Sequence, residues 1–185
     1  EKGVELLDCP VSGGEPKAIE GTISVMAGGK KEVFDKFYDV IMCMAGSAVH
    51  VGDLGSGNIC KLANQIIVAG NIAAMGEALT FATKAGANPE LIYQAIRGGL
   101  AGSTVLDAKA PMVLNRNFKP GFRIELHIKD LMNAINAAHA VDAVTPLTSL
   151  FLDMMISLRA DGLQTEDHAS LVKYYEKLNN VKVEK

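Results

Sequence analysis

The pattern of apolar and polar positions divides this 185-residue chain into two parts of different character. Up to about Asp53, β-rich runs bounded by glycines occupy residues 3–11, 22–28 and 47–52. Between the last two, apolar residues recur at helical spacing over 30–44. The order strand, strand, helix, strand is typical of the edge of an α/β sheet.

From Leu54 onward the pattern predicts only helices. The first covers 56–84 and ends before Gly86, and the second begins with Asn88 as N-cap and Pro89 in its first turn. Further helices are expected over 103–114, about 126–141, Pro146 to near Gly162, and from a cap at Thr165 or Asp167 to near Leu178. We therefore expect a mainly α chain: an α/β part at 1–53, then an all-α domain at 54–185 with a long central helix.

The helix over 56–84 is unusual because it is apolar on nearly every side. Its length of about 43 Å exceeds the width of a small domain, so one chain of this size cannot cover it. We expect partner subunits to cover it, which predicts a homo-oligomer, a dimer or tetramer, formed through this helix.

Composition excludes several classes of protein. With 49% apolar and 21% charged residues and a pI near 5.8, the chain is globular and lacks the basic footprint of a nucleic-acid-binding protein. The three cysteines, without CxxC spacing, indicate reduced thiols in a cytoplasmic protein and no zinc site. No signal peptide is expected, and the most apolar run, Ile66–Gly76, is too short to span a membrane. Because the first strand begins almost at once, we expect the chain to be a fragment with material missing upstream.

Three polar clusters are candidates for chemistry. Along the long helix, Asn58, Lys61, Asn64, Gln65 and Asn71 fall within an arc of about 140°. This stripe is either a solvated face or a ligand site. Near a helix N-terminus the dipole favours the neutral amine, so Lys61 could act as a general acid or base.

The other two clusters are short. Ser12, Gly13 and Gly14 follow the first strand, and form either a plain turn or a nest of backbone N–H groups for an anion such as a carboxylate. Lys129 and Asp130 lie in a predicted helix and form either an exposed ion pair or part of a site. The four histidines match no metal motif, so we interpret them as structural or surface residues and expect no metal.

Taken together, these clusters resemble the β-hydroxyacid dehydrogenase family. The stretch DCPVSGGEPKAIEGTISVMAGG, the G-x-x-x-K-x-x-N pattern of Gly57, Lys61 and Asn64, and the later K-D-L pattern occur in the family's order and spacing. The segments GGLAGSTVLDAKAP and NFKPGFRIELHIKD are most similar to members that reduce tartronate semialdehyde (2-hydroxy-3-oxopropanoate) to glycerate. The family's G-x-G-x-x-G motif is absent, so the resemblance covers only the end of its Rossmann domain and the whole helical domain.

The resemblance implies a role for each candidate. Lys61 would be the catalytic general acid or base, and the cofactor would be NAD(H) or NADP(H), bound mostly by the absent N-terminal part and reached by Lys129. The residues that bind a three-carbon hydroxy or oxo acid would be Ser12, Gly13, Gly14, Asn64, Phe122 and Asp130.

Two other functions stay open at this stage. A neighbouring member of the family, such as 3-hydroxyisobutyrate dehydrogenase, would carry the same motifs. A non-catalytic helical oligomerisation module would account for the long apolar helix alone. The 185 residues by themselves are expected to be inactive.

Overall fold

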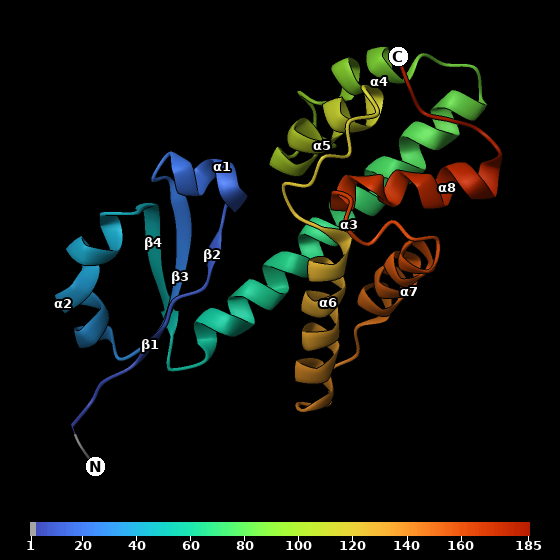
Figure 1. Cartoon of the computed structure of the whole chain (residues 1–185). Helices are drawn as coiled ribbons and strands as arrows, with labels where there is room; N and C mark the ends of the chain where they lie inside the picture. The colour runs from blue at the N-terminus through green and yellow to red at the C-terminus, as the bar shows by residue number, and fades with distance from the viewer. Residues whose placement is uncertain (1–2) are drawn as a thin grey trace. The chain divides into compact units, whose positions relative to one another are not determined.

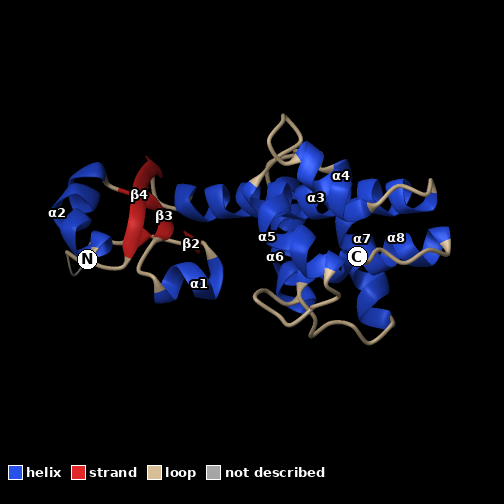
Figure 2. Cartoon of the chain, turned by 90° about the horizontal axis from the view of Figure 1, so that it is seen from above, coloured by secondary structure: helices blue, strands red, loops and turns tan. Residues whose placement is uncertain are grey.

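The fold is described from a computed structural model, which covers residues 3–185 (Figure 1). The chain forms two compact units that meet in sequence between Asn64 and Gln65, inside helix α3 (Ser56–Lys84). All strands of the described residues belong to the first unit, and the second is helical (Figure 2). The expectation of a mainly α chain with an all-α second part is confirmed.

The first unit is built around strand β3 (Ile23–Gly29). Strands β1 (Leu7–Asp8) and β2 (Val11–Ser12) pair with it antiparallel, and β4 (Ala45–Gly52) pairs with it parallel. The prediction of one continuous strand over 3–11 is wrong, because the strand is interrupted at Cys9 and Pro10. Proline has no N–H for a ladder bond, although the Pro10 carbonyl still accepts from the N–H of Met26.

Two helices accompany this sheet. Helix α2 (Lys31–Met42) connects the parallel strands, and its Phe34 and Ile41 are buried with Ile23, Val25 and Ala27 of β3. Helix α1 (Gly14–Ile19) was not predicted. None of its residues is buried, so no apolar periodicity marked it in the sequence.

The second unit packs the rest of α3 among shorter helices. These are α4 (Pro89–Ile96), α5 (Thr104–Leu114), α6 (Ile124–His139), α7 (Pro146–Ala160), the 3₁₀ helix η1 (His168–Leu171) and α8 (Val172–Asn179). Helices α6 and α7 lie side by side (Figure 1). The largest fully buried side chains of this core are Ile72, Leu79, Val113, Ile124, Leu131, Met155, Leu158, Leu171, Val172 and Val183.

The predicted helix ends agree with the structure where capping residues mark them. Gly86 has φ 84° beyond α3, and the Asn88 side chain accepts from the N–H groups of Glu90 and Leu91. Asp167, not Thr165, caps η1. Helix α6 begins two residues before the expected position, since the N–H groups of Ile124 and Glu125 donate to the carbonyls of Glu166 and Gln164 instead of to a side-chain cap.

Helix α3 is long and apolar enough, by length and composition alone, to cross a membrane. The sequence prediction that the chain has no membrane-spanning segment considered only the short run Ile66–Gly76 and not the whole length of α3. Core helices of compact domains meet the same criterion, and on α3 Ala69, Ile72 and Leu79 are at most 1% exposed within the helical core.

Candidate active site

The start of α3 is fixed by the carboxylate of Asp8, at the end of β1. One oxygen accepts from the N–H of Gly55 and the other from the N–H of Asn58, each at 2.7 Å. These are N–H groups at the head of a helix, which have no partner within it. The aspartate of the D-x-P-V-S-G-G pattern therefore anchors the helix that carries Lys61.

Glycine is required where α3 passes the sheet. A Cβ atom at Gly57 would lie 2.4 Å from the Asp8 carbonyl oxygen and 2.5 Å from that of Met26. A Cβ at Gly28 of β3 would lie 2.3 Å from a carboxylate oxygen of Asp8. Two glycines of the sequence motifs thus allow one close contact between helix and sheet.

This contact brings Lys61 to the end of β2. The Lys61 ammonium donates to the carbonyl oxygen of Val11 at 2.8 Å. Next along the chain, the Ser12 hydroxyl lies 3.5 Å from the amide oxygen of Asn64, a long contact. Ser12 therefore lies close to Lys61 and Asn64 in the first unit, although 52 residues separate it from Asn64.

Gly13 and Gly14 continue from Ser12 into α1. Their φ angles of 137° and 67° lie in the region that favours glycine. A Cβ at Gly13 would also lie 2.5 Å from the Cβ of Lys17. Both residues are exposed at the start of a helix, where N–H groups point outward.

The polar stripe of α3 is not a uniform solvated face. Asn58 is exposed, Lys61 and Asn64 are half-buried, and Gln65 is only 4% exposed. The Gln65 side chain donates to Asp130 of α6 at 2.7 Å, and the other carboxylate oxygen of Asp130 lies 3.1 Å from the Lys129 ammonium. Asp130 is thus bound to α3 within the second unit, and Lys129 is paired with Asp130.

A buried histidine pair lies next to these residues. Nδ1 of His127 and Nδ1 of His168 are 3.0 Å apart, and His127 Nε2 is 3.1 Å from the backbone oxygen of Gln65. The ring of Phe122 packs against both imidazoles, with centroids 5.8 and 5.3 Å away. No sequence signal marks this pair, because its members are 41 residues apart and match no motif.

Asp167 holds the segment that carries Phe122. Its fully buried carboxylate accepts from the Lys109 ammonium at 2.9 and 3.0 Å and from the N–H groups of Gly121, Phe122 and Ala169. Burial acts to raise the pKa of Asp167, yet that pKa is lowered overall by a charge on His168, by Lys109 and by the Ala169 N–H. Burial, followed by the charges of Lys109 and His127, lowers the pKa of His168 to about 3, despite the opposing effect of Asp167.

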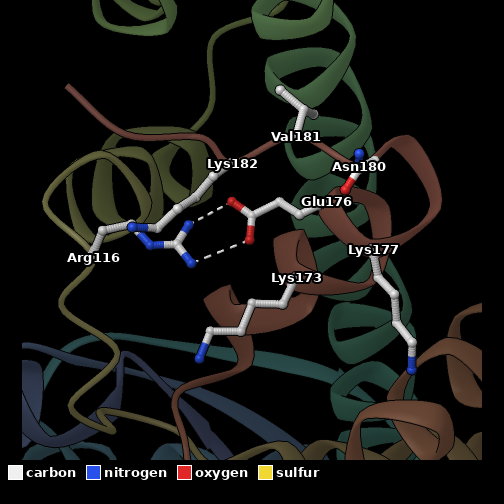
Figure 3. A pocket seen from close by; sticks show the side chains of 7 residues that line it. All are labelled: Arg116, Lys173, Glu176, Lys177, Asn180, Val181 and Lys182. Carbon is white, nitrogen blue, oxygen red and sulfur yellow. Dashed lines mark hydrogen bonds and ion pairs between the residues drawn. The ribbon is translucent and has the colours of Figure 1, made fainter.

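A pocket lies elsewhere, at the C-terminal end (Figure 3). It has a volume of about 510 Å³ and contains none of the predicted site residues. Its four cations are paired with carboxylates, Arg116 with Glu176, Lys173 with Glu166, Lys177 with Asp161 and Lys182 with Glu184. No three His, Cys, Asp or Glu side chains of residues 3–185 gather in a way that could hold a metal ion.

Comparison with known proteins assigns this arrangement to a family. Residues 55–175, more than half of the chain, match the family model for NAD-binding of NADP-dependent 3-hydroxyisobutyrate dehydrogenase. Residues 1–52 match that for the NAD binding domain of 6-phosphogluconate dehydrogenase. The chain belongs to the β-hydroxyacid dehydrogenase family. Its cofactor is NAD(H) or NADP(H), as expected.

Relatives within the family differ in their substrates. The chain is 43% identical, over 99% of its length, to 2-hydroxy-3-oxopropionate reductase of Escherichia coli. It is 33% identical to 2-(hydroxymethyl)glutarate dehydrogenase of Eubacterium barkeri, also over 99% of its length. It covers 63% and 61% of these two proteins. Among solved structures, 3-hydroxyisobutyrate dehydrogenase of Mycobacterium tuberculosis has a TM-score of 0.84 and 30% identity, over 91% of this chain and 60% of that one.

We predict that Gly57→Ala destabilises the first unit by about 1–3 kcal/mol, the usual cost of overpacking, because the new methyl group meets two carbonyl oxygens. Chemical denaturation of the full-length protein measures this effect. The control is Gly70→Ala on the same helix, where the new carbon would lie 3.4 Å from the Phe151 ring. Equal stability of the two variants would contradict the close contact.

We also predict that acid destabilises the second unit. The pKa of His168 falls from 6.5 when unfolded to about 3 when folded, since burial, Lys109 and His127 outweigh Asp167. Its contribution to stability is complete above pH 6.5 and is lost as the pH falls toward about 3, because the unfolded chain binds the proton more readily. In His168→Asn this part of the decline should disappear from denaturation midpoints measured between these pH values.

Proposed function

We propose that the full-length protein is a nicotinamide-dependent reductase that converts tartronate semialdehyde to glycerate. The observation that carries this proposal is the meeting of Lys61, Ser12 and Asn64, with the Lys61 ammonium 2.8 Å from Val11 O. The 43% identity to 2-hydroxy-3-oxopropionate reductase supports the choice of substrate.

Each residue has a chemical task in this reaction. The Ser12 hydroxyl and the exposed N–H groups of Gly13 and Gly14 would bind the substrate carboxylate. The Asn64 amide would hold a substrate oxygen. Lys61 would give a proton to the carbonyl oxygen as it gains negative charge, and its bond to Val11 holds the ammonium beside the end of β2.

The cofactor supplies the hydride when it is bound, and Lys129 fits a role in holding it. Its side chain is 64% exposed, although its ammonium lies beside Asp130, and such a group suits an anionic phosphate. Asp130 is largely buried and occupied by Gln65 and Lys129, so we infer that it braces the substrate site with Phe122. Most cofactor contacts are expected outside these 185 residues, so we expect this chain alone to have no turnover.

A second substrate has specific support. The likeness to a solved 3-hydroxyisobutyrate dehydrogenase, at 30% identity and a TM-score of 0.84, favours that oxidation as the alternative. Both substrates are small acids with an oxygen at the β-carbon, so the same carboxylate-binding residues and the same lysine would serve either reaction.

We also propose that α3 associates with a second copy of the chain. Ile67 and Phe81 are 64% and 71% exposed, and the exposed Ala74 and Ala78 lie between them. On a helix these four positions share an arc of about 60°. Small residues between two large apolar ones would let two such helices approach closely about a two-fold axis.

We predict that Lys61→Ala lowers kcat of the full-length protein by at least about a hundredfold, because the general acid is lost. The assay follows NADH and NADPH oxidation with tartronate semialdehyde. Lys31→Ala, which removes an exposed lysine paired with Asp35, should retain wild-type turnover.

Two results would count against the function. Retention of most activity in Lys61→Ala would show that the lysine has no catalytic role. A much higher kcat/KM for 3-hydroxyisobutyrate than for the tartronate semialdehyde–glycerate pair would transfer the assignment to the alternative substrate.

For the association through α3, we predict that Phe81→Glu converts a dimer or larger oligomer into smaller species, since a charge would be buried at the interface. Light scattering of the full-length protein gives the mass. Leu91→Glu is the matched control, because Leu91 is 61% exposed and belongs to α4 instead of the α3 face. A monomeric wild type would contradict the interface.

A further inference from the structure

The buried pair His127–His168 has no part in the chemistry described above, yet it touches the helix that carries the proposed catalytic lysine. His127 Nε2 lies 3.1 Å from the backbone oxygen of Gln65. In an α-helix the N–H of residue i donates to the carbonyl of residue i−4, so the N–H of Gln65 pairs with the Lys61 carbonyl. His127 therefore holds the peptide group that directly follows the turn beginning at Lys61 and including Asn64.

The protons of the pair follow from this geometry. A backbone carbonyl can only accept, so Nε2 of His127 must carry a hydrogen. In the neutral ring Nδ1 of His127 is then the acceptor, and Nδ1 of His168 donates to it across 3.0 Å. The two rings thus form a directed chain from His168 through His127 to Gln65 O.

Packing holds this chain in one orientation. Both imidazoles are at most 5% exposed. Phe122 covers the two rings, and the backbone N–H of His168 donates to the Phe122 carbonyl at 2.9 Å. Beyond His168, Asp167 is fixed by the Lys109 ammonium. Neither ring can turn without breaking a buried hydrogen bond, which is costly.

We propose that His127 is a positioning residue for the reductase reaction, acting through its hydrogen bond to the Gln65 carbonyl to set the turn of α3 that bears Lys61 and Asn64. This role rests on the proposed function. His168 supports this role of His127, because its donation to Nδ1 of His127 keeps the hydrogen of that ring on Nε2.

Two amide substitutions separate the bonds of His127. In His127→Gln the side-chain nitrogen can take the place of Nε2, which preserves the donor to Gln65 and removes the acceptor for His168. In His127→Asn the amide reaches only the position of Nδ1, which preserves a partner for His168 and removes the bond to Gln65. Each variant loses one buried hydrogen bond, so their melting temperatures should fall by similar amounts.

The experiment measures kcat, KM and melting temperature of the full-length wild type and both variants, with whichever of the two substrates it turns over. We expect kcat to fall by about tenfold or more in His127→Asn with little change in KM, because the proton donor is displaced. In His127→Gln we expect kcat within about threefold of wild type. A merely structural role would change kcat in step with melting temperature.

Equal kcat values for the two variants would overturn the role of His127. If His127→Asn does not fold, His168→Asn and His168→Leu decide instead: the asparagine keeps a donor toward His127 and should retain kcat, whereas the leucine should lower it. Equal kcat in that pair also overturns the proposal. A wild type without turnover on either substrate would contradict the proposed function itself. Equal kcat values of the variants would contradict only the role of His127.

Discussion

The closeness of α3 to β1 and β3 is the constraint on which the first unit depends. Both carboxylate oxygens of Asp8 accept hydrogen bonds from N–H groups at the start of the helix. Gly28 and Gly57 have no side chain that would clash at this contact. Because Lys61 follows Gly57 by about one turn, the direction of its side chain is set by this contact. The proposed general acid is therefore positioned by three residues that need never touch a substrate.

The second unit buries polar groups, so its stability requires that each of them has a hydrogen-bond partner. Gln65, His127 and Asp167 are each at most 4% exposed, and each is engaged in hydrogen bonds. A core of this kind is stable only when its partners are in place, because an unpaired buried polar atom costs more than a hydrogen bond contributes. Such a network therefore favours a single arrangement of α3, α6 and η1.

Local signals explain which features the sequence could predict. The bounds of α3, the cap at Asn88 and the glycine at position 86 depend on neighbouring residues and were predicted correctly. Helix α1 buries nothing and was missed. The family motifs identified Ser12, Lys61 and Asn64 as a group, although their roles stay predictions. The pairing of His127 with His168 depends on tertiary packing alone, so no local pattern could reveal it.

The carboxylate of Asp167 also has a consequence for the length of the loop before α6. Because it binds the N–H groups of Gly121 and Phe122, and Asp167 N–H in turn binds the Phe118 carbonyl, the segment between these residues has a fixed length. The side chain of Lys119 is exposed and takes no part in these bonds, whereas a residue inserted beside it would break at least one of them. The turn at 98–102, where Leu100 is fully exposed, is held instead by backbone hydrogen bonds of its own, from Gly99 N–H to the Ile96 carbonyl and from Gly102 N–H to the Gly99 carbonyl.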